Sequence, residues 1–384
     1  MRIGIIGGGP AGLYFALLMK KHNSAHQIEV MEQNPADATY GWGVVFSERA
    51  LSFLKNCDAE SYADIEAELK TWNDQTIVHQ DEQVHIDGSA YSGIARLALL
   101  RILQKHCRYH GVELHFETRI TDISSCGDYD LLVGADGVNS VVRQQYAEHF
   151  QPSTQLLSNT YIWYGTHQLF ETLSLIFRTY RVGAFVAHCY PYSDRTSTFI
   201  VECDAETWRR AGFEQMSEAE SRAYCEDIFR DDLAGHALLL NKPVWLHFRV
   251  VSNRRWSYRN VVLLGDALRT VHFSIGSGTR MALEDAIALS TALATTGDVP
   301  AALQAFEQAR RPGAEKVLSI AQHSSTWYET FHEKMDLDPV ALTYSYVTRS
   351  GRIDPEALRQ KSPRFMERFE ASQAVKRSEE IPGS

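Results

Sequence analysis

Residues 2–12 read Arg2-Ile-Gly-Ile-Ile-Gly7-Gly-Gly9-Pro10-Ala11-Gly12, a short apolar run that enters a glycine-rich turn. A helical apolar pattern follows from Leu13 to Lys21, and a second apolar run, Ile28 to Met31, ends at Glu32. This order predicts a strand, a tight turn, a helix and a second, parallel strand. The fold is therefore expected to begin with a βαβ unit.

Each glycine of this turn has its own task in a dinucleotide-binding unit. Gly7 makes the turn, Gly9 lets the backbone approach a pyrophosphate, and Gly12 permits close packing of the helix on the strand, with Pro10 and Ala11 between them. Glu32, 20 positions beyond Gly12, is placed to accept from a ribose hydroxyl and repels a 2′-phosphate. The motif predicts a nucleotide of the FAD or NAD type, although purely structural glycine turns also match so short a pattern.

Composition excludes several other classes of protein. The 384 residues include 44% hydrophobic ones and carry a formal net charge of −10, whereas nucleic-acid binding needs clustered positive charge. The six cysteines are scattered without metal-ligand spacing, so no metal site is predicted. No stretch reaches the roughly 20 apolar residues of a membrane span, and no signal peptide is visible at the N-terminus. We therefore expect a cytoplasmic protein that binds neither membranes nor nucleic acid.

Two further motifs follow the first along the chain. A buried strand over residues 131–134 runs into Asp136-Gly137, with Arg143 in the helix beyond. Another strand, over residues 260–264, ends at Gly265-Asp266 and is followed by a glycine-rich loop with Gly276 and Gly278. The order of all three motifs resembles that of the FAD-dependent aromatic hydroxylases of the p-hydroxybenzoate hydroxylase type, over nearly the whole chain.

The resemblance implies how FAD is held. Asp266 is expected to bind the ribityl chain, and the loop from Phe273 to Arg280 to pass beneath the isoalloxazine ring. A basic residue, Arg96, is expected near the phosphates. The family has His and then Pro in the third motif, whereas Leu268-Arg269 and His272-Phe273 stand there in this chain. The other residues expected to bind the cofactor are Gly43, Val44, Gly276, Gly278 and Thr279.

The resemblance also implies the chemistry. NADH or NADPH reduces FAD, dioxygen adds to the flavin as a hydroperoxide, and its distal oxygen attacks an electron-rich ring. Segments 41–47, 161–166, 197–203 and 272–279 are similar both to the branch that hydroxylates salicyl-CoA and 2-aminobenzoyl-CoA and to tryptophan hydroxylases. The tail segments 337–339 and 348–352 favour the thioester branch, with CoA or a carrier protein as the carrier. A free aromatic such as tryptophan, a flavin halogenase and a non-catalytic flavin-fold binding protein are the alternatives.

We predict an α/β fold: a Rossmann-like FAD-binding domain with an inserted β-rich substrate domain and C-terminal helices. The FAD-binding domain is expected to be discontinuous, at residues 1–72, 93–158 and 258–333. The substrate domain is expected at residues 73–92 and 159–257, and a C-terminal segment at 334–384. The sequence does not indicate an oligomeric state.

Candidate catalytic residues lie in the predicted substrate domain and in the flavin-side loop. On a strand over residues 184–190, alternation places His188 and Tyr190 on one face, predicted to line the substrate cavity; a packed structural pair fits the same pattern. His272 is a second candidate for proton transfer near neutral pH, although a lone histidine is more often structural. The residues predicted to contact the substrate are Tyr161, Trp163 and Phe273 in the aromatic pocket, and Arg349 and Arg352 at the phosphates of CoA.

Overall fold

The computed structural model describes the chain except residues 48, 352 and 380–384. Its first layer is a six-stranded sheet that begins with the predicted βαβ unit. The strand β1 (Arg2–Ile6) pairs in parallel with β2 (Gln27–Met31) on one side and with β9 (Leu131–Gly134) on the other. Its isoleucines are almost fully buried, as expected for a central parallel strand with both faces covered. The sheet is completed by β8 (Glu113–His115), β17 (Val261–Leu263) and β16 (Ser257–Tyr258).

Helices cover this sheet and carry the motif residues. The helix α1 (Pro10–His22) follows the first glycine turn and packs against α4 (Arg96–Tyr109) and α9 (Gly278–Thr296). The helix α4 begins directly after β7 (Tyr91–Ala95). This strand pairs with β3 (Gly43–Ser47) and with β4 (Lys70–Trp72) in a separate sheet. The remaining helices on this side of the molecule are α2 (Arg49–Cys57), α3 (Ala59–Glu68), α5 (Val141–Gln145) and α6 (Ala147–Phe150).

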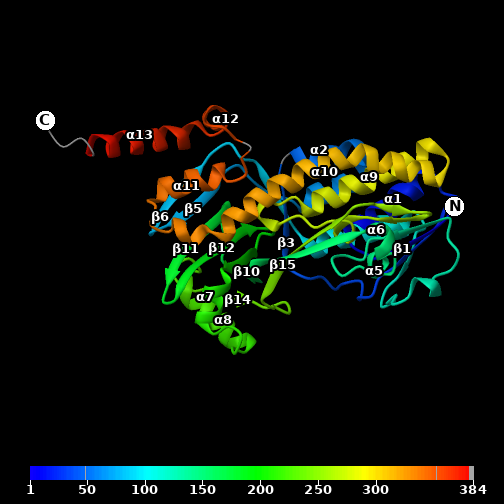
Figure 1. Cartoon of the computed structure of the whole chain (residues 1–384), viewed down its shortest axis with the longest axis horizontal. Helices are drawn as coiled ribbons and strands as arrows, with labels where there is room; N and C mark the ends of the chain where they lie inside the picture. The colour runs from blue at the N-terminus through cyan, green and yellow to red at the C-terminus, as the bar shows by residue number, and fades with distance from the viewer. Residues whose placement is uncertain (48, 352, 380–384) are drawn as a thin grey trace.

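A second, eight-stranded sheet forms the other half of the molecule (Figure 1). Its central strand β12 (Gly183–Pro191) alternates as predicted: Phe185 and Ala187 face one hydrophobic cluster, whereas Val186 faces another. Two short helices, α7 (Ala205–Ala211) and α8 (Glu218–Ile228), cover the first face. The other strands are β10 (Pro152–Thr166), β11 (Leu173–Tyr180), β13 (Ser197–Cys203), β14 (Leu238–Leu239), β15 (Leu246–Asn253), β5 (Gln75–His79) and β6 (Glu82–Ile86).

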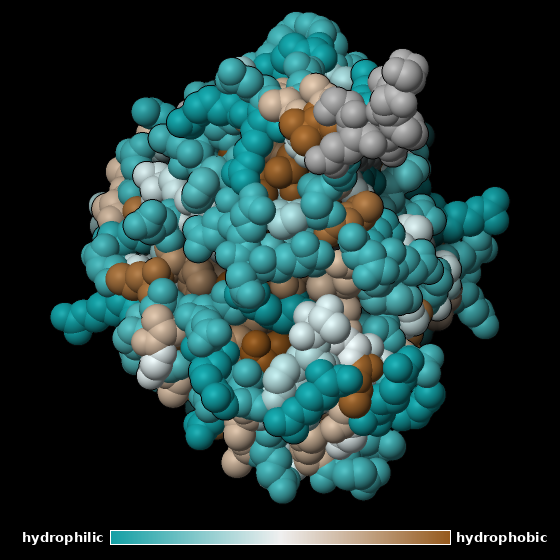
Figure 2. Space-filling view, turned by 90° about the vertical axis from the view of Figure 1, so that its left-hand side faces the viewer, coloured by the Kyte–Doolittle hydropathy of each residue, from teal (hydrophilic) through white to brown (hydrophobic). Residues whose placement is uncertain are grey.

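The opposite face of this sheet is covered by the C-terminal helices, drawn in orange and red in Figure 1. The long helix α10 (Val299–Glu329) runs from the first sheet to the second and is followed by α11 (Pro339–Thr348), α12 (Pro355–Lys361) and α13 (Pro363–Glu379). The end of the molecule that carries these helices has a mostly hydrophilic surface, with the visible hydrophobic side chains in small groups (Figure 2). None of the described helices combines the length and apolarity that a bilayer crossing requires.

The predicted fold class is confirmed: a Rossmann-like parallel sheet with its helices, an inserted β-rich part, and C-terminal helices. The strand β10 begins at Pro152 and so runs across the predicted domain boundary at residue 158. The division into domains otherwise stays a prediction.

Candidate active site

Two helix N-termini open into one cavity between the two halves of the molecule. The helix α1 starts after Gly9 and α9 starts after Ser277, and neither has a side-chain cap. The free N–H groups and the helix dipole at such ends favour anions and acceptor atoms. Residues at both helix starts line the cavity, whose volume is about 700 Å³. This size is in the range of small-molecule and cofactor sites.

The glycines of the first turn differ in what surrounds them. A Cβ on Gly12 would lie 2.2 Å from the carbonyl oxygen of Gly7, and Gly7 has a φ of +110°. A Cβ on Gly9, in contrast, would meet no atom within 4 Å. Gly7 and Gly12 are therefore required by the packing of the turn, whereas the space beside Gly9 is open to a ligand. The Glu32 carboxylate accepts hydrogen bonds from the Gly8 and Asn34 amides, at 2.7 and 2.8 Å, and lies behind the turn.

Asp266 and Arg96 bring opposite charges to the cavity wall. The Asp266 side chain is exposed to the cavity although it lies deep in the protein, and burial raises the pKa of its carboxyl, with Arg96 opposing the rise. Neither charged group has a side-chain hydrogen bond to another described residue. Charged groups at such depth are normally hydrogen-bonded, so both fit a polar ligand such as the ribityl and phosphate groups of FAD.

The second motif supports the third one. The Arg143 guanidinium donates to the carbonyl oxygen of Ala267 at 2.9 Å and also to that of Val138. Asp136 accepts from the Val141 amide at 2.6 Å and so fixes the start of α5. The two turns are thereby held together beside the part of the cavity that is lined by Gly9, Arg96, Asp266 and Gly278. We call this part the cofactor cradle.

Most of the predicted site residues line this cavity. Four predicted residues are absent from the lining: Gly7, Gly12, Glu32 and His272. Arg352 is outside the described residues. The predicted residues that line the cavity are Gly9, Pro10, Ala11, Gly43, Val44, Arg96, Tyr161, Trp163, His188, Tyr190, Asp266, Phe273, Gly276, Gly278, Thr279 and Arg349.

His188 is part of a buried pair. Its Nε2 lies 3.0 Å from Oε2 of Glu202, whose other oxygen accepts from the Asn159 amide at 2.8 Å. Burial raises the pKa of Glu202, but the hydrogen bond and charge of His188 outweigh it, so this pKa lies below its ordinary value. An ionised carboxylate accepts the Nε2 proton, and in the neutral tautomer of His188 this leaves Nδ1 as the acceptor. Nδ1 has no hydrogen-bond partner among the described residues.

An aromatic chamber surrounds His188. The His188 ring lies 5.4 Å from the Phe273 ring and 5.0 Å from the Tyr328 ring, between ring centres. Tyr161 lies 4.8 Å from Phe273, and Trp163 packs against Gly41, where a Cβ would lie 2.6 Å from the indole. We call the part of the cavity lined by Tyr161, Trp163, His188, Phe273 and Tyr328 the aromatic chamber.

Tyr190 lies in the cavity lining, on the same face of β12 as His188. Its hydroxyl donates to the carbonyl oxygen of Gly43 at 2.8 Å, and burial raises its pKa. This hydrogen bond joins β12 to the start of β3.

His272 lies next to the flavin-side loop and outside the cavity lining. The imidazole stacks on Phe273, and its Nδ1 lies 2.8 Å from the Ser274 hydroxyl. Burial lowers the pKa of His272 to about 4. A ring with so low a pKa is a weak base near pH 7, and its contacts are with the flavin-side loop.

Arg349 was expected at the phosphates of CoA, and the structure gives it another task. Its guanidinium donates to the carbonyl oxygens of Ser274 and Tyr346 and to the Ser324 hydroxyl, at 3.0, 2.7 and 3.0 Å. It also lies 3.8 Å from the Tyr346 ring centre. Arg349 thus ties α11 and α10 to the flavin-side loop.

Sequence reasoning missed Glu202 and Tyr328 as site residues. Glu202 could have been found, because a carboxylate inside the apolar run 197–203 must be paired when buried. Tyr328 lies on α10, and its approach to His188 depends on tertiary packing that no local pattern shows.

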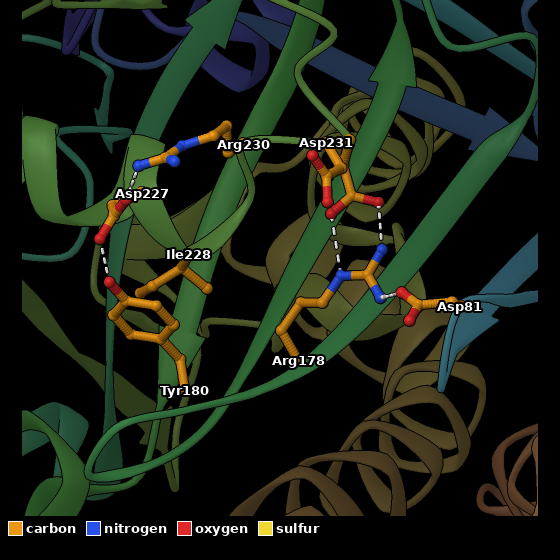
Figure 3. A pocket seen from close by; sticks show the side chains of 8 residues that line it. Asp81, Arg178, Tyr180, Asp227, Ile228, Arg230 and Asp231 are labelled. Atoms are coloured by element: carbon orange, nitrogen blue, oxygen red, sulfur yellow. Dashed lines mark hydrogen bonds and ion pairs between the residues drawn. The ribbon is translucent and has the colours of Figure 1, made fainter.

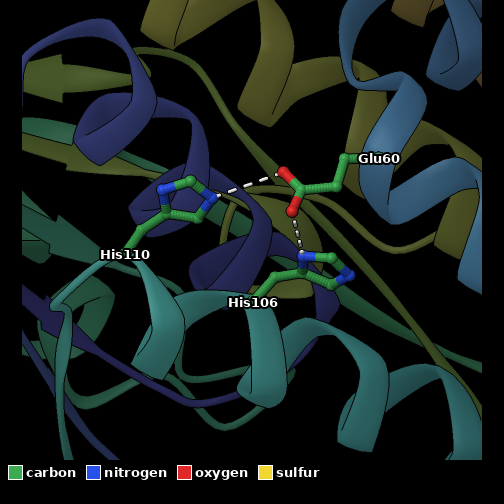
Figure 4. Close-up of side chains that lie close together, drawn as sticks. All are labelled: Glu60, His106 and His110. Carbon is green, nitrogen blue, oxygen red and sulfur yellow. Dashed lines mark ion pairs between the residues drawn. The ribbon is translucent and has the colours of Figure 1, made fainter.

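Two other groups of polar side chains lie outside this cavity. A cavity of about 310 Å³ contains Arg178, which pairs with Asp232 and Asp81 at 2.6 and 2.8 Å (Figure 3). Glu60 lies 3.8 Å from His106 and 3.5 Å from His110 (Figure 4), but Lys21 is closer, at 2.8 Å. In both groups the charged side chains are paired with each other. We therefore assign both groups a role in stability.

The fold and the cradle define an FAD-binding enzyme, and comparisons with known proteins agree. Residues 125–321 match the family model described as an FAD binding domain. Salicyloyl-CoA 5-hydroxylase of Streptomyces sp is 37% identical over 91% of this chain and 70% of its own length. Protodeoxyviolaceinate monooxygenase of Chromobacterium violaceum is 38% identical over 94% of this chain and 98% of its own length.

A carrier-linked relative is similar as well. The 3-hydroxy-4-methyl-anthranilyl-[aryl-carrier protein] 5-monooxygenase of Streptosporangium sibiricum is 35% identical over 92% of this chain and 95% of its own length. Among solved structures, 2-methyl-3-hydroxypyridine-5-carboxylic acid oxygenase superposes with a TM-score of 0.70 at 18% identity, covering 94% of this chain and 96% of that one. This chain belongs to the FAD-dependent aromatic monooxygenases, with FAD as cofactor and NAD(P)H as co-substrate.

Proposed function

We propose that this enzyme hydroxylates an aromatic acyl thioester with an ortho hydroxyl or amino group, of the salicyl or 2-aminobenzoyl type. The observation that carries the proposal is the aromatic chamber, which is continuous with the cofactor cradle and holds the His188–Glu202 pair. Aromatic walls suit a ring, and one acceptor nitrogen suits one ring substituent with a proton to give.

Some residues of the site hold the cofactor, and others prepare the substrate for reaction. Bound FAD, once reduced by NAD(P)H, would activate dioxygen, from which one oxygen atom is transferred to the ring and the other leaves as water. Nδ1 of His188 accepts a hydrogen bond from the ortho hydroxyl or amino group, which raises electron density at the para position. Glu202 fixes the tautomer of His188, and Asn159 fixes Glu202.

Exclusion of water depends on the chamber walls. Tyr161 and Phe273 pack together, and burial raises the pKa of Tyr161 to about 12, so its hydroxyl stays neutral. Tyr328 is fully buried, and its hydroxyl has no hydrogen-bond partner among the described residues. A dry site lengthens the life of a reactive oxygen donor and strengthens the hydrogen bond to His188.

The test is oxidation of NADH by the FAD-loaded protein with salicyl-CoA, free salicylate or tryptophan, followed by mass analysis of the products. We expect salicyl-CoA to stimulate oxidation and to gain one oxygen atom, para to its hydroxyl. Benzoyl-CoA, which lacks the ortho group, is the matched control and is expected not to be hydroxylated. Hydroxylation of free salicylate with equal efficiency would contradict the thioester assignment.

A free or non-thioester aromatic is the second candidate. It is favoured by the similarity to protodeoxyviolaceinate monooxygenase, which is covered almost end to end. Hydroxylation of tryptophan alone in the same assay would support this alternative.

A further inference from the structure

The cavity continues past the aromatic chamber, away from the cofactor cradle. Its far part lies between the segment 75–91 and the C-terminal residues 346–350 and 353–362. In Figure 1 these are the cyan strands β5 and β6 and the orange helices α11 and α12. We name this part the carrier-arm lobe, lined by Gln75, Ile86, Ser89, Ser350, Leu358 and Lys361.

We propose that the carrier-arm lobe binds the phosphopantetheine arm of the thioester substrate. This inference rests on the proposed function, because it assumes that the acyl ring occupies the chamber beside His188. The thioester then points away from the flavin and the arm follows the lobe.

The lining has the chemistry of such an arm. Phosphopantetheine alternates methylene and dimethyl groups with two amides and a hydroxyl. The lobe likewise combines apolar side chains, Ile86, Ile353 and Leu358, with the hydroxyls of Ser89 and Ser350. Mixed walls of this kind bury apolar area while a few polar groups fix orientation.

The lobe has walls that are fixed to each other before any ligand binds. The Tyr346 hydroxyl on α11 donates to Oε1 of Gln75 at 3.2 Å, and Nε2 of Gln75 donates to the Tyr91 hydroxyl at 2.8 Å. At the other end the Ser362 hydroxyl donates to the carbonyl oxygen of Asp87 at 2.7 Å. A preformed channel lowers the entropy cost of ordering a flexible arm.

Close backbone packing beside Asp87 also fixes the two walls of the lobe to each other. Gly88 has a φ of +76°, and a Cβ there would lie 1.9 Å from the carbonyl oxygen of Lys361. The turn after β6 and the end of α12 therefore touch directly, and the side of the lobe is closed at this point.

Two positively charged side chains lie at the surface end of the lobe. Lys361 is exposed, and Arg364 follows it with a side chain that is 77% exposed. The carboxylates of Asp87 and Asp74 lie 3.5 and 3.7 Å from the Arg364 guanidinium and reduce its charge. In a chain of net charge −10, this rim suits the phosphate at the end of the arm.

The cavity lining has a second group of exposed residues, which serves as a comparison. It lies beside the cofactor cradle, where Leu246, His247 and Arg249 of β15 are exposed. Arg249 donates to the Asn139 side chain at 2.7 Å. An arm that left the cavity here would pass along the cofactor cradle, so the charge of Arg249 is not expected to discriminate among carriers.

The test uses salicyl thioesters of increasing arm length: N-acetylcysteamine, pantetheine, CoA and a phosphopantetheinylated carrier protein. For the wild type, kcat/KM is expected to rise by about tenfold or more from the shortest to the phosphorylated carriers. Lys361→Glu is expected to lower kcat/KM for the CoA thioester by about five- to tenfold and to leave the N-acetylcysteamine thioester within about twofold. Ser350→Phe, which fills the lobe, is expected to remove the advantage of every longer arm.

Binding of benzoyl-CoA by calorimetry gives a readout independent of turnover. It should weaken in Lys361→Glu and Ser350→Phe while FAD content and Tm stay unchanged. Arg249→Glu is the matched control and should keep the ratio of CoA to N-acetylcysteamine efficiency. Whichever phosphorylated carrier is used more efficiently identifies the source of the arm.

The outcomes separate the two proposals. If the wild type hydroxylates no thioester, the proposed function fails. If all thioesters are hydroxylated equally well, or if Arg249→Glu rather than Lys361→Glu lowers the ratio, the proposed function stands and the carrier-arm lobe is rejected.

Discussion

Nε2 of His188 lies 3.0 Å from Oε2 of Glu202, and both side chains are buried next to the aromatic chamber. Oε1 of the same carboxylate is held by Asn159. The pair gives the chamber one oriented acceptor, Nδ1 of His188, in an otherwise aromatic wall. This relationship determines the first two predictions.

Replacement of His188 by Ala is expected to lower kcat for hydroxylation by about 100-fold, the usual size of a lost general acid–base group. FAD content should not change, because His188 is not part of the cofactor cradle. The measurement is product formed per NADH consumed, together with the flavin absorbance. A loss of FAD with unaltered coupling would show that His188 is a packing residue instead.

Glu202→Gln keeps the shape of the carboxylate and removes its charge. Because the pKa of Glu202 is below its ordinary value of 4.5, its stabilisation is present above pH 4.5 and is lost as the pH falls through the folded-state pKa. At pH 7 the free energy of unfolding of the variant should be about 1–3 kcal/mol lower than that of the wild type. Urea unfolding between pH 3 and pH 7 should show that this difference shrinks at the acid end. A constant difference would contradict an ionised Glu202.

His272 makes a separate contribution to the pH dependence of stability. Since burial lowers its pKa from 6.5 to about 4, the unfolded chain takes up a proton below pH 6.5 that the folded chain refuses. Stability is full above pH 6.5 and falls by about 3 kcal/mol as the pH drops to 4. His272→Asn, whose amide oxygen replaces Nδ1, should flatten this fall. The pH–rate profile of this variant should match that of the wild type. If the variant lacked a step near pH 6 that the wild type shows, His272 would be a proton acceptor after all.

Arg349 is expected to act on the flavin-side loop. Lysine cannot reproduce three donors in one plane, so Arg349→Lys should cost about 1–3 kcal/mol of stability and weaken FAD binding. Arg359→Lys is the control, since Arg359 forms exposed ion pairs with Glu356 and Glu370 and should change stability by less than about 0.5 kcal/mol. Thermal unfolding and FAD titration of both variants provide the comparison. Equal effects would argue against the loop-tying role.

The positions of site residues can be predicted from the sequence where they depend on local backbone geometry. Gly9, Asp266 and Gly278 follow strands directly or precede helices, and such positions are set by turn chemistry and hydrogen-bond rules alone. The alternation on β12 likewise places His188 on the face that lines the cavity.

Side-chain partners were harder to predict. His272, Tyr190 and Arg349 carry suitable chemical groups, but each is committed to a protein partner. These partners come from loops and helices distant in sequence, and which donor meets which acceptor depends on packing in three dimensions. For the same reason Tyr328 was not recognised beside His188.

The glycine turn gives a prediction that separates folding from cofactor binding. Gly9 has a φ of −78°, which alanine adopts freely, and its Cβ would enter the open cavity. Gly9→Ala should therefore fold with the stability of the wild-type apoprotein but bind FAD about tenfold or more weakly, because the methyl group occupies the space of the pyrophosphate. Gly12→Ala places its Cβ 2.2 Å from the Gly7 carbonyl oxygen and should cost about 3 kcal/mol even without FAD. Unfolding of both apoproteins and titration with FAD test the pair. If Gly9→Ala destabilised the apoprotein while Gly12→Ala only weakened FAD binding, the assignment of open space beside Gly9 would be wrong.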